Sequence, residues 1–117
     1  MRWTDEALVE ALGRYEQICI DNRMEQNAID SYRTYAKRFL EWRKGDYWPR
    51  GGSKPKQRPT PMIVETSDLR GEAKTYVGVV EASGRAQDTI DTYYRHAMFF
   101  VRWLEGTFVP GATLNRG

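Results

Sequence analysis

The spacing of the Lys and Arg residues is the feature of this sequence that indicates a chemical role. Between residues 43 and 58, six Lys and Arg side chains stand against a single acid, although the whole chain carries a net charge of only +2. Upstream of that run, Arg33 and Lys37 are four residues apart, as are Thr34 and Arg38. A helix places such pairs in adjacent rows on one exposed surface. Because rows of positive charge release condensed counterions from phosphates, they predict salt-sensitive contact with nucleic acid.

The basic run of residues 43–58 is interleaved with aromatic side chains. Tyr47 and Trp48 stand among its charges, and mobile basic arms with aromatics suit both phosphate contact and base stacking. Two simpler interpretations remain open. The run could be a soluble charged linker whose aromatics fold back on the core, and the upstream bases could lie on a solvated helix face with Asp30 and Glu41 as ion-pair partners.

Catalytic and metal-binding chemistry is not expected. His96 is the only histidine and Cys19 the only cysteine of the 117 residues, so a nucleophilic triad or a His/Cys metal site lacks its partners. Cys19 lies between two isoleucines, which favours a small buried side chain in a reducing compartment. The apolar runs are too short for a transmembrane helix or a secretory segment. We therefore expect a cytoplasmic protein that is not an enzyme, with no cofactor and no membrane partner.

The sequence repeats itself without a gap at one constant offset, which places Leu8 on Leu69 and Tyr15 on Tyr76. The identities fall on aromatic, glycine and proline residues in a fixed order, which chance does not produce. Neither copy is long enough to bury its own apolar face, so the two copies are expected to share one core. The matched pairs include Tyr15 and Tyr76, Ile29 and Ile90, Tyr32 and Tyr93, Phe39 and Phe100, Trp42 and Trp103, Gly45 and Gly106, and Pro49 and Pro110.

Each copy is predicted to form two helices. Thr4 is the expected N-cap of the first helix, and apolar residues recur after it at helical spacing. The second helix is expected to open near Asn27, with that side chain as its cap, and to end at Gly45. Asp88 and Gly106 repeat these signals in the second copy.

This pattern predicts an all-α fold, a four-helix domain of two repeated helical hairpins. The connector between the hairpins is long, basic and rich in Pro and Gly, and its four prolines exclude a helix. We expect residues 1–117 to form one domain, with the first hairpin at 4–45, the connector at 46–65 and the second hairpin at 66–107.

Two stretches of the sequence resemble the SAM-like core-binding domain found at the N-terminus of tyrosine recombinases (phage integrases). The stretch MEQNAIDSYRTYAKRFLEW, residues 24–42, resembles the first hairpin of that domain, in which a short turn leads into a helix with spaced aromatic residues. The stretch from Asp68 to Gly111 resembles the second hairpin, in which a Gly turn precedes Thr-Ile and an aromatic-rich helix ends before a Gly and a Pro. The resemblance covers residues 5–111. The chain has no room for the separate catalytic domain, so the resemblance implies a DNA-binding module without recombinase chemistry.

The resemblance implies contact with double-stranded DNA, because the second and fourth helices of that domain lie against DNA. On those helices it points to basic and polar side chains off the apolar face, and in the connector to a flexible basic clamp. Thr34 and Tyr94 are the side chains expected to reach a base edge or a sugar. The implied DNA-binding residues are Arg33, Thr34, Lys37, Arg38, Lys44, Lys54, Lys56, Arg58, Tyr94, Arg95 and Arg102.

A helical protein-interaction module that kept the fold and lost DNA binding is the alternative function. The first and third helices are acidic and the net charge is low, which suits such a module. Residues 98–101 are too apolar for one buried stripe, so Met98 or Phe99 is expected to face outward. That surface would receive a protein partner or a recombinase catalytic domain.

Overall fold

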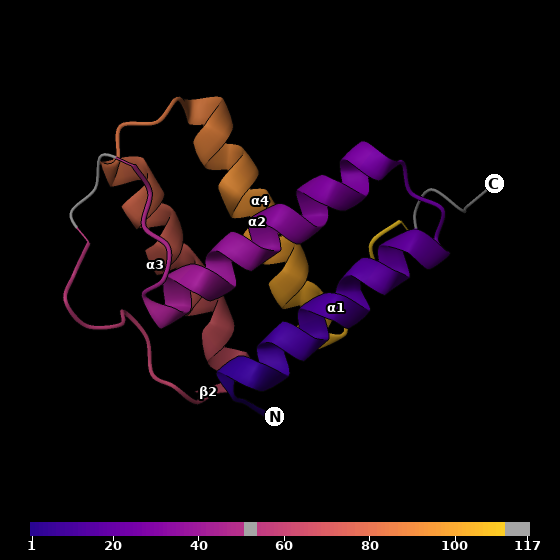
Figure 1. Cartoon of the computed structure of the whole chain (residues 1–117), viewed down its shortest axis with the longest axis horizontal. Helices are drawn as coiled ribbons and strands as arrows, with labels where there is room; N and C mark the ends of the chain where they lie inside the picture. The colour runs from indigo at the N-terminus through magenta and orange to yellow at the C-terminus, as the bar shows by residue number, and fades with distance from the viewer. Residues whose placement is uncertain (51–53, 112–117) are drawn as a thin grey trace.

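The computed structural model describes residues 1–50 and 54–111. These residues adopt a mostly helical, all-α architecture to which two short strands add a small sheet (Figure 1). The elements are β1 (Arg2–Trp3), α1 (Asp5–Asp21), α2 (Gln26–Lys44), β2 (Val64–Glu65), the 3₁₀ turn η1 (Thr66–Asp68), α3 (Leu69–Ala82) and α4 (Gln87–Glu105).

Local signals set several of the helix ends as the sequence predicts. The Thr4 hydroxyl accepts a hydrogen bond from the Ala7 backbone N–H at 3.1 Å, and two acids lie in the first turn of α1, where carboxylates favour the helix dipole. At their C-termini, α2 and α4 end at Gly45 and Gly106, which adopt left-handed φ angles of 85° and 83°. Residues with a Cβ atom are strained in this conformation, which explains glycine at both ends.

The caps expected for α2 and α4 are wrong. The helices begin at Gln26 and Gln87, one residue earlier than predicted, and the residues before them supply no side-chain cap in the described structure. Each glutamine instead donates from Nε2 to an aspartate one turn later. Gln26 reaches Asp30 at 2.9 Å, and Gln87 reaches Asp91 at 2.8 Å. The predicted caps, one residue after each glutamine, therefore lie inside the first turn.

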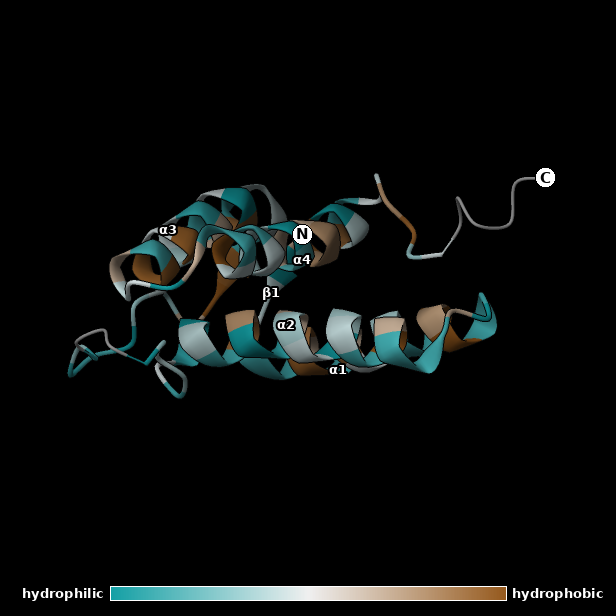
Figure 2. Cartoon of the chain, turned by 90° about the horizontal axis from the view of Figure 1, so that it is seen from above, coloured by the Kyte–Doolittle hydropathy of each residue, from teal (hydrophilic) through white to brown (hydrophobic). Residues whose placement is uncertain are grey.

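Two helical hairpins pack face to face. α1 packs along α2 and α3 along α4, and Figure 2 shows the two pairs as separate layers. α2 crosses α4 between the layers, and side chains from all four helices join one hydrophobic core. At its edge the strands pair antiparallel, Trp3 with Val64 and Arg2 with Glu65. Trp3 and Val64 are themselves corresponding residues of the repeat, so the sheet joins matching segments of the two copies.

The same aromatic contacts occur once in each half of the core. The ring centre of Tyr15 lies 5.1 Å from that of Phe100, and the matching distance from Tyr76 to Phe39 is 5.5 Å. Tyr15 lies 5.2 Å from Trp103, as Tyr76 does from Trp42. The third matching pair is Tyr15–Tyr32 at 6.1 Å and Tyr76–Tyr93 at 6.2 Å. Where the halves meet, Tyr35 stacks at 5.0 Å on His96, its own counterpart. The repeat of the sequence is thus also a repeat in the packing of the core.

A short segment after each hairpin docks against the other hairpin. Tyr47 follows α2, and its hydroxyl lies 3.3 Å from that of Tyr93 on α4. Pro110 follows α4, and its carbonyl accepts a hydrogen bond at 2.7 Å from Asn22 at the end of α1. Pro49 and Pro110 are both fully buried. The start of the connector is therefore ordered, while its residues 51–53 lie outside the described ranges.

Candidate nucleic-acid interface

The outer face of α2 carries five of the residues expected to bind DNA. The opposite side of the helix buries Ala36, Phe39 and Leu40 in the core, which leaves the basic side in contact with solvent. On that side Lys37 is exposed and the other bases are partly exposed. We name this surface the α2 face. It consists of Asp30, Arg33, Thr34, Lys37, Arg38, Glu41 and Lys44, with four bases against two acids.

Surface ion pairs hold two of these bases. Arg33 Nε lies 3.5 Å from Glu16 of α1, and its Nη2 lies 3.7 Å from an aspartate one turn earlier. Lys44 Nζ lies 3.4 Å from Asp46. Exposed ion pairs contribute only about 0–1 kcal/mol, so Arg33 and Lys44 stay available to a phosphate. Lys37 forms no ion pair with any residue that the structure describes.

Arg38 is held among aromatic rings rather than extended into solvent. Its Nη1 donates to the Tyr93 hydroxyl at 2.9 Å. Its guanidinium carbon lies 5.4, 6.0 and 5.7 Å from the ring centres of Tyr35, Tyr47 and Tyr93, within the range of cation–π attraction. Arg38 therefore links α2, the connector and α4.

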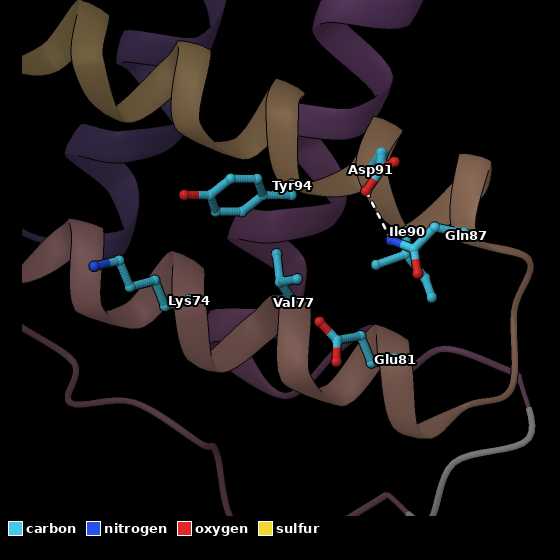
Figure 3. A pocket seen from close by; sticks show the side chains of 7 residues that line it. All are labelled: Lys74, Val77, Glu81, Gln87, Ile90, Asp91 and Tyr94. Carbon is cyan, nitrogen blue, oxygen red and sulfur yellow. Dashed lines mark hydrogen bonds between the residues drawn. The ribbon is translucent and has the colours of Figure 1, made fainter.

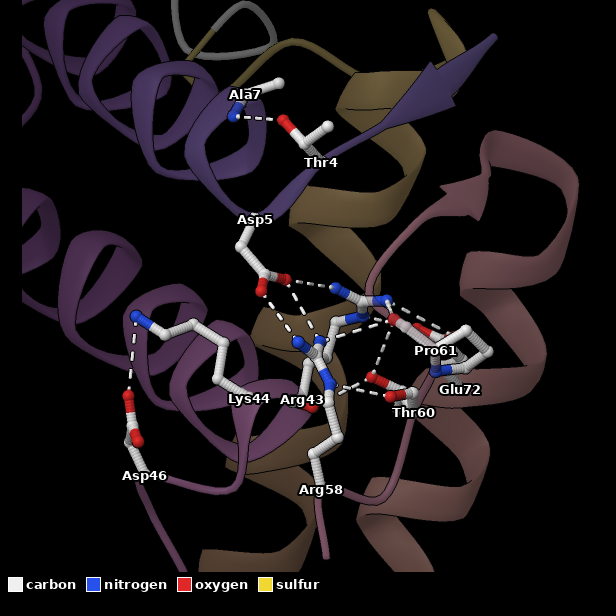
Figure 4. A network of polar contacts seen from close by, with 10 residues as sticks. All are labelled: Thr4, Asp5, Ala7, Arg43, Lys44, Asp46, Arg58, Thr60, Pro61 and Glu72. Carbon is white, nitrogen blue, oxygen red and sulfur yellow. Dashed lines mark hydrogen bonds and ion pairs between the residues drawn. The ribbon is translucent and has the colours of Figure 1, made fainter.

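The connector is not a flexible clamp at Arg58. The Arg58 guanidinium binds Asp5 at 2.8 and 3.1 Å and the carbonyls of Thr60 and Pro61 at 2.7 and 3.2 Å (Figure 4). The chain here also returns to the end of α2, where a Cβ atom added to Gly45 would lie 3.4 Å from the Arg58 Cα atom. Arg58 is a fixed structural residue because its charge is already paired and its donors are occupied.

Arg43 is the centre of the same polar network. Only 1% of its side chain is exposed, and its Nε donates to Glu72 of α3. Its Nη1 lies 3.5 Å from Asp5, and its Nη2 donates to the Pro61 carbonyl at 3.2 Å. The Thr60 hydroxyl donates to the Arg43 carbonyl at 2.8 Å. Two arginines and two carboxylates thus join α1, α2, the connector and α3 (Figure 4).

Asp5 and Arg58 of this network stabilise each other's charged form. The hydrogen bond from Arg58 holds the pKa of Asp5 below its usual range, and Asp5 raises the pKa of Arg58 in return. The contribution of this pair to stability is present above the unfolded-state pKa of Asp5 and is lost as the pH falls through the lower folded-state value. Sequence reasoning missed this role of Arg43. Arg43 lies seven residues after Ala36 and four after Phe39, so helical spacing places it on the core side of α2. This spacing is the signal in the sequence that indicates a buried role for Arg43.

The exposed bases of the connector are Arg50, Lys54 and Lys56. None of the three forms an ion pair within residues 1–50 and 54–111. Arg58 is fixed against Gly45 at the C-terminal end of α2, and Lys56 and Lys54 precede Arg58 by two and four residues. Both lysines are exposed to solvent.

The corresponding outer face of α4 is electrically balanced. Arg95 and Arg102 are exposed there, as the sequence predicts for residues off the apolar face. Asp91 and Glu105 occupy the same face, four residues before Arg95 and three residues after Arg102. This face therefore offers a phosphate less attraction than the α2 face.

Tyr94 is grouped with side chains of α3 rather than with the bases of α2. It lies in a groove between α3 and α4, where Figure 3 shows its ring across from Lys74 and Val77. The same groove is lined by the carboxylates of Glu81 and Asp91. Since these acids repel phosphate, the structure does not bring Tyr94 into the basic surface.

Of the two residues expected to provide an outward-facing surface, the structure buries Met98 and leaves Phe99 partly exposed. Only 4% of Met98 is exposed, and the residue belongs to the main core. Phe99 is half-buried, because its ring stacks on Tyr32 at 5.5 Å and on Phe108 at 4.8 Å. α4 packs against α3, α2 and η1, so it buries a wider arc than the single stripe that the sequence pattern assumes.

His96 is buried where α2 crosses α4. Its ring stacks on Tyr35 at 5.0 Å and meets Tyr32 edge-on at 4.9 Å. Burial, together with the positive charge of the adjacent Arg95, lowers the pKa of His96 to about 4. The imidazole is therefore neutral at physiological pH and adds no charge to a nucleic-acid interface.

We expect His96 to make the fold less stable in mild acid. The unfolded chain binds this proton near pH 6.5, but the native state binds it only near pH 4. The free energy of unfolding should therefore fall as the pH drops below 6.5, by on the order of 1 kcal/mol between pH 7 and 5. His96→Tyr, which installs the residue type of its counterpart Tyr35, should flatten this dependence in urea denaturation at each pH. An unchanged slope in the variant would contradict the assignment.

The remaining chemistry of the described residues is limited. No His, Cys, Asp and Glu side chains among them gather into a group that could hold a metal ion. Burial raises the pKa of the Cys19 thiol to about 11, so this side chain is a poor nucleophile. None of the described helices combines the length and the apolar content needed to cross a membrane.

Comparison with known protein families, with curated proteins and with solved structures finds no match for this chain. Its function is therefore inferred from the geometry and charge of the α2 face.

Proposed function

We propose that this domain binds double-stranded DNA through its phosphates, using the α2 face together with Lys54 and Lys56. The observation that carries this function is the unequal charge of two corresponding helix faces. The α2 face holds four bases and two acids, while the corresponding positions of α4 hold Arg95 and Arg102 against Asp91 and Glu105. Both helices are 19 residues long and pack in the same core, so folding does not require the extra positive charge on α2.

Contact with phosphates suits the state of these side chains. Lys37, Lys54 and Lys56 are exposed and form no ion pair in the described part of the chain, so binding would release counterions from DNA without first breaking a salt bridge. Thr34 lines a hollow of the α2 face together with Arg38 and Asp30, and its hydroxyl is a donor for a phosphate or a sugar. Non-specific binding of this kind has a Kd of roughly 10⁻⁴–10⁻⁶ M.

The same proposal includes a SAM-like fold and a location in the cytoplasm. Two hairpins with matching aromatic contacts support a SAM-like arrangement of the kind found in the core-binding domain of tyrosine recombinases. Within it the chain acts as a non-catalytic, cytoplasmic DNA-binding module. The protein-interaction alternative keeps only Phe99 of its expected surface, because Met98 is buried while Phe99, stacked on Tyr32 and Phe108, stays partly exposed.

Charge reversal on the α2 face is expected to weaken DNA binding. Fluorescence anisotropy with a labelled duplex should give an affinity that falls linearly with salt on logarithmic axes. Lys37→Glu should lower the affinity about tenfold and reduce the salt slope by about 1. Lys74→Glu, the same change at an exposed residue of α3, is the matched control and should have little effect.

Two results would contradict the proposed function. The first is no binding by the wild-type chain even at low salt, which would direct attention to a protein partner. The second is an equal loss of affinity in Lys37→Glu and Lys74→Glu, which would indicate a response to net charge rather than contact by the α2 face.

A further inference from the structure

Two corresponding side-chain clusters flank the crossing of α2 and α4. The first cluster surrounds Tyr32 and is apolar. Phe99 stacks on Tyr32 at 5.5 Å and on Phe108 at 4.8 Å, and Met24 belongs to the small buried core against which Tyr32 packs. Ring contacts among Tyr32, Phe99 and Phe108 dominate this cluster, and the ring of His96 meets Tyr32 edge-on at 4.9 Å.

The second cluster surrounds Tyr93 and is charged. The guanidinium carbons of Arg38 and Arg85 lie 5.7 and 5.5 Å from the centre of the Tyr93 ring, and Tyr47 completes the group. We name these four residues the arginine cluster. In the repeat, Arg38 corresponds to Phe99, Arg85 to Met24, Tyr47 to Phe108 and Tyr93 to Tyr32.

The two arginines lack a negative partner. Arginine stays protonated at any pH at which proteins fold, and two guanidinium groups around one ring repel each other. Neither Arg38 nor Arg85 forms an ion pair within the described ranges, and the buried Nε of Arg85 makes no hydrogen bond there. Packing does not explain the charges, because Met24 and Phe99 fill the corresponding positions with apolar groups.

We propose that the arginine cluster is a binding site for a phosphate group. Planar guanidinium groups bind phosphate oxygens through pairs of parallel hydrogen bonds. The hydroxyls of Tyr47 and Tyr93 share one hydrogen bond at 3.3 Å, so this pair adds one further donor. Burial, and then the hydrogen bond with Tyr93, raises the pKa of Tyr47 to about 12, so this hydroxyl keeps its proton at neutral pH.

This site deepens the proposed function and rests on it. Arg38 belongs both to the arginine cluster and to the α2 face, so a DNA strand lying along the α2 face would bring a backbone phosphate to Arg85 as well. Sequence reasoning missed Arg85 because it lies in the turn before α4, outside the helical rows. Comparison of the two copies identifies Arg85, because the second copy has the charged Arg85 at the position where the first copy has the apolar Met24.

The decisive variant is Arg38→Phe with Arg85→Met, because it installs the residues of the apolar cluster. Its melting temperature should equal or exceed that of the wild-type chain. In anisotropy titrations with the labelled duplex we expect at least tenfold weaker binding and a salt slope smaller by about 2. Arg85→Gln, which keeps a polar side chain, should reduce the slope by about 1 and decides the question if the double variant fails to fold.

Titration with inorganic phosphate at constant ionic strength distinguishes a DNA phosphate from a free one. Proton–nitrogen NMR follows the arginine Nε–H signals, and that of Arg85 should shift when the site is occupied. Unchanged DNA affinity in both variants would overturn the site and leave the proposed function intact. If the wild-type chain binds no duplex, the proposed function fails. A saturable shift of Arg85 with inorganic phosphate would then assign the site to a free phosphate, and no shift would overturn the site too.

Discussion

Replacing Arg43 with leucine is expected to lower the free energy of unfolding by about 3–5 kcal/mol. Only 1% of the Arg43 side chain is exposed, and its partner Glu72 is 14% exposed. Without the guanidinium, the Glu72 carboxylate remains largely buried with its opposite charge removed, which is the costly result of breaking a buried ion pair. In a chain of 117 residues, such a loss is a large share of the total stability.

The second copy of the repeat supplies a matched control for Arg43. The residues that correspond to Arg43 and Glu72 are Leu104 and Ala11, so the equivalent positions are apolar there. The double variant Arg43→Leu with Glu72→Ala should recover most of the lost stability, because both charges leave the interior together. The other arginine and carboxylate of the network stay paired at 2.8 and 3.1 Å.

Urea denaturation followed by circular dichroism, at neutral pH, measures both effects. A single variant that loses less than about 1 kcal/mol would place Arg43 among exposed ion pairs, contrary to its burial. A double variant less stable than the single one would show that the stability comes from packing of the two side chains rather than from charge pairing.

The helices could be predicted from the sequence because their signals are local. Thr4 caps α1, and Gly45 and Gly106 end α2 and α4 where glycine alone adopts the left-handed turn without strain. The repeat also identifies which rings share the core, as Tyr15 and Tyr76 show by their matching contacts.

The distribution of the basic residues between structure and surface could not be predicted in the same way. Arg58 and Lys56 are two residues apart in one basic run, yet Arg58 is paired with Asp5 and Lys56 is exposed. Their difference depends on Asp5, which is 53 residues away in the sequence, so no local pattern contains it. Which of Met98 and Phe99 would be buried could not be predicted for a related reason, because the number of elements packed around α4 is a property of the tertiary fold.

Truncating Phe39 or Phe100 to alanine is expected to cost about 3–5 kcal/mol in each case. Both side chains are fully buried and occupy corresponding positions of the two copies. Phe39 lies 5.5 Å from Tyr76, and Phe100 lies 5.1 Å from Tyr15. Each truncation therefore leaves a cavity beside a buried tyrosine that has little freedom to fill it.

The comparison between the two truncations tests whether the halves share one core. Because the surroundings of Phe39 and Phe100 match, urea denaturation should give losses that agree within about 1 kcal/mol, a narrower spread than such substitutions show at unrelated sites. Tyr94→Ala, at a partly exposed ring outside the core, should cost much less and serves as the control. A large loss at one phenylalanine with a small loss at the other would mean that one hairpin forms most of the core and the second only covers it. In that case the two hairpins would have similar sequences but would contribute unequally to the free energy of unfolding.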